Sequence, residues 1–109
     1  MPTSLTLDTA RCSDGKLTLT AAGEIDLSNI DAFKQALTTA SAEAASEGET
    51  FTVDCSAVEY LDSAAINVLF ASADHVKLLI AHPLVISILT VSGITELVTV
   101  EPAPPTAEL

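Results

Sequence analysis

Ser63 is the residue whose type and position could do the most specific chemistry in this chain. It stands in the segment YLDSAAI (60–66), after a strand-ending loop and at the expected start of a helix. A serine there exposes its hydroxyl beside backbone N–H groups without helical partners, and these groups would stabilise an attached phosphate. The plainer alternative is that Ser63 or Asp62 only caps the helix. The residues alone leave both interpretations open.

Asp26 and Asp62 could be imagined as a general acid and a general base. Each stands just before an expected helix, where a carboxylate accepts free N–H groups and suits the helix dipole, so we interpret both as caps. His75 and His82 flank an apolar strand with no nucleophile or acid paired to either, and no glycine-rich phosphate-binding motif is present. An enzyme is not expected.

Metal binding and secretion are not expected either. Cys12 and Cys55 are isolated thiols without CxxC spacing, and with the two histidines they form no zinc template. The first residues lack the basic and apolar segments typical of a signal peptide. The longest apolar stretch, 76–89, is interrupted and falls short of the ~20 apolar residues of a membrane span. We expect a cytoplasmic protein with reduced thiols and without a cofactor or metal.

The charge balance excludes two classes of partner. The 109 residues include four Lys and Arg against fifteen Asp and Glu, which gives a formal net charge of -11. Binding to phosphate backbones needs cations that displace counterions, so nucleic acid is not expected as a direct partner. An anionic membrane surface is disfavoured for the same reason.

Residue periodicity predicts the strands that position these side chains. Alternating apolar and polar residues predict a β-hairpin with strands near 5–8 and 17–21, joined by a turn at 13–16 in which Gly15 is free to adopt a positive φ. A third strand at 51–55 is followed by an expected loop at 56–60. The segment 76–81 is almost continuously apolar, as expected of a strand covered on both faces. A last strand is expected at 97–100.

Three helices are expected between those strands. The first begins at a capping box of Ser28 and Asp31 and ends at Gly48. Its buried face should consist of Ile30, Phe33, Ala36, Leu37, Ala40 and Ala44. The second, 64–74, should bury Ile66, Leu69, Phe70 and Ala73. The third has Pro83 in its first turn and ends at Gly93.

The element order ββαβαβαβ predicts one α/β domain at residues 3–100. Strands joined by crossover helices form a mixed, largely parallel sheet of four or five strands, with the hairpin at one end. The Pro-rich segment 101–109 should not continue the sheet and is expected to form a flexible tail.

The third helix predicts a contact surface. Residues 84–91 carry no charge, although a helix on one side of a sheet should expose a polar face. At 100° per residue Leu84, Ile88 and Val91 share a face, so exposed apolar surface is expected there. We predict self-association as a homodimer, or partner docking, through this helix. The alternative is that the tail or the last strand covers it.

Three motifs together resemble the STAS domain family, and more narrowly its anti-sigma factor antagonist branch. They are GEIDL (23–27) after the second strand, VDCS (53–56) on the third strand and LDS (61–63) at the following helix. The resemblance covers roughly residues 5–100 and includes the element order and the segment SGI (92–94). It implies a STAS-like fold and a regulator of transcription that binds an anti-sigma factor, often one with a kinase fold, and so frees a sigma factor.

The same resemblance implies the functional residues. In the family the serine directly after the aspartate is phosphorylated by the partner, and that position here is Ser63. The implied partner-binding residues are Glu24, Asp26, Asp62, Ser63 and Ala64. Unmodified protein would hold the anti-sigma factor, and a phosphate on Ser63 would weaken the contact. Any ATP and magnesium would belong to the kinase partner.

Two departures from the family pattern bear on phosphorylation. Ala64 and Ala65 stand where the family usually has Ser or Thr followed by Gly, and the segment 63–83 is several residues shorter than expected. A rival interpretation is therefore a STAS accessory module that docks constitutively on the ATPase subunit of a transporter or lipid-transfer complex. A second rival is a scaffold within a larger sensory assembly.

Overall fold

The computed structural model describes residues 5–11 and 15–103, and within them five strands form one sheet. The strands are β1 (Leu5–Arg11), β2 (Leu17–Ile25), β3 (Phe51–Leu61), β4 (Val76–Ala81) and β5 (Thr99–Pro102). They lie in the order β1-β2-β3-β4-β5; β1 pairs antiparallel with β2, and each later pair is parallel. The predicted mixed, largely parallel sheet with a hairpin at one end is confirmed.

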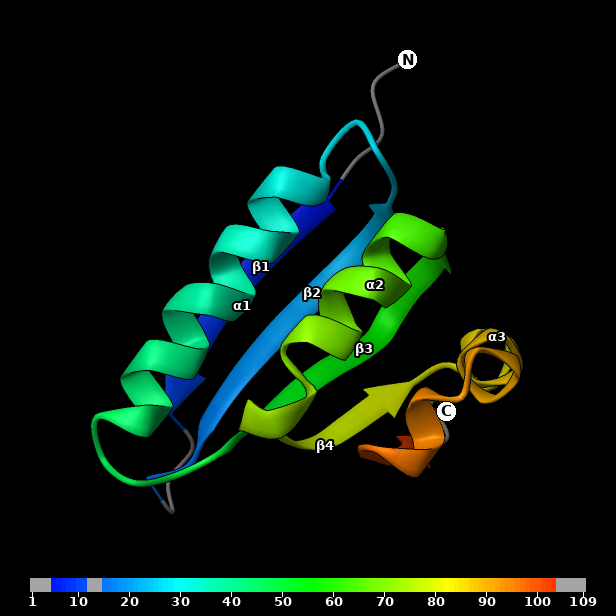
Figure 1. Ribbon diagram of the computed structural model, residues 1–109. Coiled ribbons are helices and arrows are strands. Elements are labelled where there is room, and N and C mark those ends of the chain that lie inside the picture. Colours follow the sequence, from blue (N-terminus) through cyan, green and yellow to red (C-terminus); the bar gives the residue numbers. More distant parts are fainter. Residues whose placement is uncertain (1–4, 12–14, 104–109) are drawn as a thin grey trace, which may run out of the picture.

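Helices alternate with the parallel strands, as the predicted order requires. They are α1 (Ile30–Ala45), α2 (Ser63–Ala71) and α3 (Pro83–Ser92), with short 3-10 turns at Ala73–His75 and Ile94–Glu96. Figure 1 shows α1 and α2 side by side over one face of the sheet, whereas α3 stands apart from them beside the end of β4. Gly93 ends α3 with a φ of 90°, as predicted.

The core lies between the sheet and these helices. On α1 the predicted apolar face is confirmed: Phe33, Leu37, Ala40 and Ala44 are buried, and Ile30 and Ala36 are half-buried at its border. On α2 the prediction was right for Leu69 but too broad for Ile66 and Phe70, which are half-buried. Ala73 is buried in the turn after α2, and the buried Ala65 was not predicted. Each fully buried Leu or Phe contributes roughly 1.5–3 kcal/mol of hydrophobic stabilisation.

The two ends of α1 differ in how well the sequence predicted them. The capping box of Ser28 and Asp31 is wrong, because Asn29 is the residue that precedes the helix. At the other end Gly48 adopts a φ of 68°. Its N–H donates to the Ala45 carbonyl, and the next N–H donates to the Ala44 carbonyl at 2.9 Å, which is the hydrogen-bond pattern of a Schellman motif. The predicted role of Gly48 is confirmed.

β3 is longer than predicted, because the expected loop at 56–60 is part of the strand. Two bulges, each with one extra residue in β3, interrupt the alternation of buried and exposed side chains. They lie between the pairs Thr20↔Asp54 and Ala22↔Ala57, and between Gly23↔Val58 and Glu24↔Tyr60. The Asp54 carboxylate accepts the Ser56 N–H at 2.9 Å and so stabilises the first bulge. Strict alternation of buried and exposed residues therefore ends at Cys55, which is where the predicted strand ended.

The last strands also depart from expectation. On β4, Leu79 and Ala81 are buried but Leu78 and Ile80 are only half-buried, so the second face of the strand is not fully covered. β5 begins two residues later than predicted because a 3-10 turn occupies Ile94–Glu96. It also includes Pro102, which the sheet tolerates because β5 is an edge strand. The first two residues of the expected tail thus belong to the sheet, and 104–109 lie outside the described residues.

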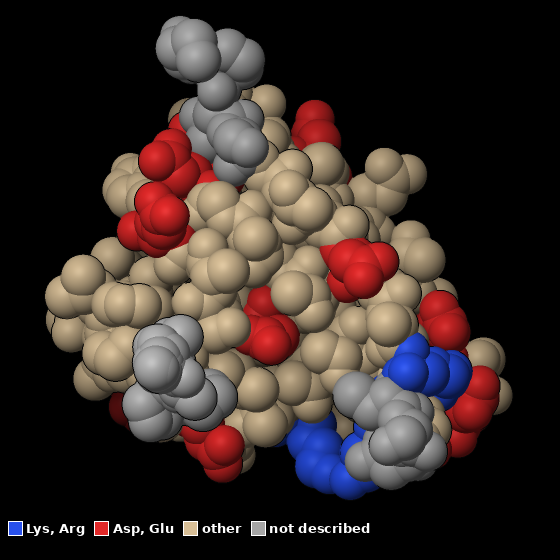
Figure 2. All heavy atoms as spheres, turned by 180° about the vertical axis from the view of Figure 1, so that it is seen from behind, with Lys and Arg blue, Asp and Glu red and all other residues tan. Residues whose placement is uncertain are grey.

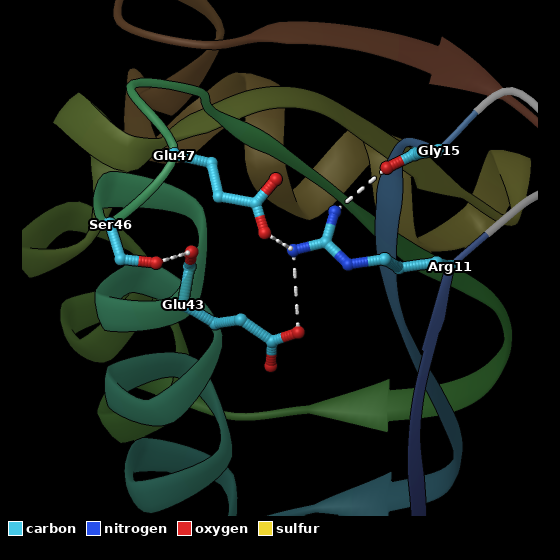
Figure 3. A network of polar contacts seen from close by, with 5 residues as sticks. All are labelled: Arg11, Gly15, Glu43, Ser46 and Glu47. Carbon is cyan, nitrogen blue, oxygen red and sulfur yellow. Dashed lines mark hydrogen bonds and ion pairs between the residues drawn. The ribbon is translucent and has the colours of Figure 1, made fainter.

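Charge is distributed unevenly along the sheet. Arg11 at the end of β1 forms ion pairs with Glu43 at 3.4 Å and Glu47 at 2.9 Å, and its guanidinium also donates to the Gly15 carbonyl (Figure 3). These contacts tie the hairpin to the end of α1. Seen from behind the sheet, basic groups gather at one end and acidic groups are spread more widely (Figure 2).

Candidate functional site

Two of the three sequence motifs meet where β2 and β3 end. Glu24 pairs with Tyr60 and Ile25 with Leu61 in the parallel ladder. Just beyond the ladder, the Asp62 N–H donates to the Ile25 carbonyl at 3.1 Å. Because the carboxyl ends of parallel strands share one edge of a sheet, GEIDL and LDS form a single surface there. This register brings Asp26 and Asp62 to the same edge of the sheet.

Asp62 and Ser63 have different roles at the start of α2. The Asp62 carboxylate accepts the Ala65 N–H at 3.1 Å and is the N-cap, as predicted. Ser63 is the first residue of the helix and is exposed, and no hydrogen bond among the described residues engages its hydroxyl. Asp62 rather than Ser63 therefore caps the helix, and the Ser63 hydroxyl is accessible.

Asp26 does not cap α1, contrary to the prediction. Its carboxylate turns instead to Ser28, accepting the backbone N–H at 2.8 Å and the side-chain hydroxyl. The Asn29 side chain accepts the Asp26 N–H at 3.0 Å and donates to the Glu24 carbonyl at 2.9 Å. These bonds fix the loop between β2 and α1. Aspartate side chains often accept the backbone N–H two residues further along the chain, so this turn was an alternative to capping that the sequence offered.

The two alanines after Ser63 are built into the helix. Ala65 is fully buried, and its N–H is held by Asp62. Ala64 is half-buried beside it, and α2 is regular from its first residue. The glycine that the family usually has near this position would supply backbone freedom that a regular first turn does not use.

Two large apolar side chains flank the site and were not predicted. Leu27 is 76% exposed and follows Asp26 directly, and Tyr60 is 49% exposed and pairs with Glu24. Large exposed apolar side chains in one small area are typical of a protein contact. Leu27 lies two residues beyond the end of β2, and its apolar type alone gives no signal in the sequence that the side chain is exposed.

The site is acidic, and the cations of the sheet lie at its other end. Glu24 is exposed and Asp26 and Asp62 are half-buried at the carboxyl ends of the strands. Lys16 precedes β2 and Lys77 lies near the start of β4, so both belong to the opposite end, where they line one shallow hollow. The site therefore presents negative charge beside the exposed side chains of Leu27 and Tyr60.

The histidines and Cys55 have structural surroundings. His82 Nδ1 accepts the Leu84 N–H at 3.1 Å and caps α3, while His75 is exposed. Burial and, to a smaller extent, the neighbouring Asp54 charge raise the pKa of the Cys55 thiol to about 12. A thiol that stays protonated is a poor nucleophile and metal ligand. Cys12 lies outside the described residues.

In the part of the chain that the structure describes, no three His, Cys, Asp or Glu side chains group as metal ligands. Within residues 5–11 and 15–103, none of the helices has both the length and the apolar character needed to cross a membrane.

Comparisons with known proteins point to one family. The family profile described as "Mlab, STAS domain" matches residues 9–99. Among solved structures, an anti-sigma factor antagonist from Mycobacterium paratuberculosis is similar with a TM-score of 0.76 and 24% sequence identity, over 96% of this chain and 89% of that chain. At this identity the likeness concerns the fold, and it confirms the predicted STAS-like architecture. No curated protein matches the sequence.

Proposed function

Because the chain belongs to the STAS domain family, we propose that it is an anti-sigma factor antagonist, which binds an anti-sigma factor and so frees a sigma factor. One observation carries the proposal: Ser63 is exposed, with an unengaged hydroxyl, on the surface that GEIDL and LDS form together. One solved structure with a similar fold is described as an anti-sigma factor antagonist. The protein is proposed to act in the cytoplasm as a regulator of transcription without catalytic activity of its own.

Binding would combine an apolar contact with charge complementarity. Leu27 and Tyr60 supply the apolar area, and Glu24, Asp26 and Asp62 supply the negative charge around Ser63 and Ala64. Apolar and aromatic side chains at the centre of an interface usually carry most of its affinity, whereas charges set partner choice and association rate. The unmodified surface would thus hold a basic, partly apolar face of the anti-sigma factor.

Phosphorylation would switch this contact off. A kinase partner would transfer the γ-phosphoryl group of ATP to the Ser63 hydroxyl oxygen, with release of ADP and of the hydroxyl proton. The ATP and its magnesium would be bound by that partner. The phosphate adds about -1.5 to -2 charge beside Asp62, which already uses its carboxylate as a cap. A partner that packs closely there would have to desolvate the new anion, so its affinity should fall.

The proposal is tested with the protein purified from its native cells. Copurifying proteins are identified, the complex is incubated with ATP, and added phosphate is located by mass spectrometry. We expect phosphate on Ser63, persistent binding by Ser63→Ala in the presence of ATP, and at least tenfold weaker binding by Ser63→Asp. Ser87→Ala, a change at an exposed serine on α3, is the matched control. Absence of phosphate on Ser63, with equal binding by the two Ser63 variants, would refute the switch.

A second candidate function is a STAS accessory module that docks on the ATPase subunit of a transporter or lipid-transfer complex. Ala64 and the buried Ala65 favour it, because they replace the residues that usually follow the phosphorylated serine. The matching profile is also not described as an anti-sigma factor antagonist. This candidate predicts an ATPase subunit as the copurifying protein, with binding that is unaffected by ATP.

The exposed face of α3 is proposed as a further contact. Leu84, Ile88 and Val91 are 75%, 40% and 89% exposed, so the prediction of uncovered apolar surface is confirmed. Val85 and Leu89 face the core, and Ile86 packs half-buried against it. The apolar stripe of Leu84, Ile88 and Val91 would bind a second copy of the chain or the anti-sigma factor.

A further inference from the structure

β3 extends well beyond its neighbour β4. The ladder between them ends at the pair Cys55↔Ala81, after which the chain turns at His82 into α3. β3 continues to Leu61, paired only with β2 among the described residues. Backbone groups of a strand point alternately to its two sides, so those of 57–59 that point away from β2 have no partner strand within the described residues. Figure 1 shows β3 running beyond the end of β4, so this part of β3 is an edge of the sheet that no described strand covers.

A pocket of about 370 Å³ lies along this free edge. Its lining residues are Ser56, Ala57, Val58, Glu59, His82 and Leu84. The strand edge thus forms one wall and the start of α3 forms the other. Leu84 is 75% exposed at this wall, and Glu59 is an exposed carboxylate on the strand. The cleft therefore combines unpaired main-chain groups, an apolar side and a negative charge.

We propose that this cleft binds an extended peptide segment of a partner protein by strand addition to β3. Main-chain hydrogen bonds to the edge would supply affinity, and an apolar side chain of the peptide would enter the pocket against Leu84. A Lys or Arg beside that side chain would meet Glu59. The free edge is the feature that selects an extended peptide rather than a helix or a small molecule.

Charge decides between the candidate occupants. The chain has a formal net charge of -11, and Glu59 lines the cleft itself. A second copy would bring the same charge to this edge. The chain's own segment 104–109 contains Glu108 and no Lys or Arg, so it also lacks the cation that complements Glu59. A basic segment of a different protein fits both the edge and its charge. The proposal does not depend on phosphorylation of Ser63.

The test uses the full chain and a fluorescein-labelled seven-residue peptide of alternating lysine and valine with a central leucine. Binding is measured by fluorescence anisotropy, and backbone amide shifts of the ¹⁵N-labelled protein locate it. We expect the largest shifts within 56–59 and at 84, and at least tenfold weaker binding by Glu59→Lys and by Leu84→Glu. Val91→Glu, a change at an exposed residue at the far end of α3, should bind within twofold of the unmodified protein. Circular dichroism verifies that each variant is folded.

Two control peptides and one truncation complete the test. A peptide N-methylated at alternate amides should lose at least tenfold in affinity, because it cannot make the ladder of hydrogen bonds, and a peptide with glutamate for lysine should also lose affinity. Equal binding by the methylated peptide would overturn strand addition. Equal losses by Leu84→Glu and Val91→Glu would assign the binding to the apolar stripe of α3. A tenfold gain on deletion of 104–109, or a dimer that Leu84→Glu dissociates, would identify the chain itself as the occupant and refute the proposal.

Discussion

Substitution of Asp62 and of Ser63 should separate folding from recognition at two adjacent residues. Asp62 accepts the N–H of Ala65, whereas no hydrogen bond among the described residues engages the Ser63 hydroxyl. Asp62→Ala should therefore destabilise the protein and Ser63→Ala should not. If Ser63 were a second cap, both variants would lose stability.

The size of the difference follows from the contacts. Loss of an N-cap acceptor costs about 0.5–2 kcal/mol, and Ala65, whose N–H would be left without that acceptor, is fully buried. We expect a loss of about 1–2 kcal/mol for Asp62→Ala. Ser63→Ala removes an exposed hydroxyl and introduces the residue with the highest helix propensity, so its effect should stay within about 0.5 kcal/mol.

Urea unfolding followed by circular dichroism measures both changes, and thermal unfolding gives an independent value. A loss of 1 kcal/mol corresponds to a decrease of about 4 °C in Tm for a domain of this size. Ser87→Ala controls for the removal of an exposed helical hydroxyl elsewhere. Equal losses by the Asp62 and Ser63 variants, or a larger loss by Ser63→Ala, would refute the assignment of the cap.

Three further predictions concern the thiol, the partner surface and α3. Burial raises the pKa of Cys55 from 9.0 to about 12, so the unfolded chain ionises first; the free energy of unfolding should fall as the pH rises from 9 towards 12, by up to about 1.4 kcal/mol per pH unit. Cys55→Ala should lack that component in pH-dependent urea unfolding. Leu27→Ala should leave Tm unchanged, because the side chain is 76% exposed, but weaken binding of the anti-sigma factor about tenfold in calorimetry. Val91→Lys should reduce the mass measured by light scattering at high concentration, or weaken partner binding; a monomeric unmodified protein with unchanged affinity in the variant would contradict a contact through α3.

Most of the fold could be predicted because it depends on regular burial. The buried faces of α1 and of β2 followed from spacing alone, because their buried positions recur at the period of each element. The part of β3 beyond Cys55 could not be predicted, because the two bulges shift the buried positions to Val58 and Leu61. The bulges arise from the pairing of β3 with β2, and the local sequence of β3 carries no information about that pairing.

The site was predicted less completely than the fold. The register of β2 with β3 brings Asp26 and Asp62, two of the implied partner-binding residues, to one edge. Their roles differ, because the hydrogen-bond partners of a carboxylate depend on loop conformation. Asp62 meets the first N–H groups of α2, whereas Asp26 is drawn to Ser28. The exposure of Leu27 was not predicted, because the exposure of a single apolar side chain depends on the conformation of the whole loop.

The order of Asp62 and Ser63 would allow the proposed switch at the end of β3. The N-cap and the first helical residue lie side by side, but only the N-cap side chain can reach back to the N–H groups of the first turn. Asp62 occupies that place, so the helix start is satisfied without the serine. Ser63 can then be modified, or replaced, at little cost to the fold. Exchange of the two residue types would place the hydroxyl in the cap, and phosphorylation would then act on the start of α2 as well as on the partner contact.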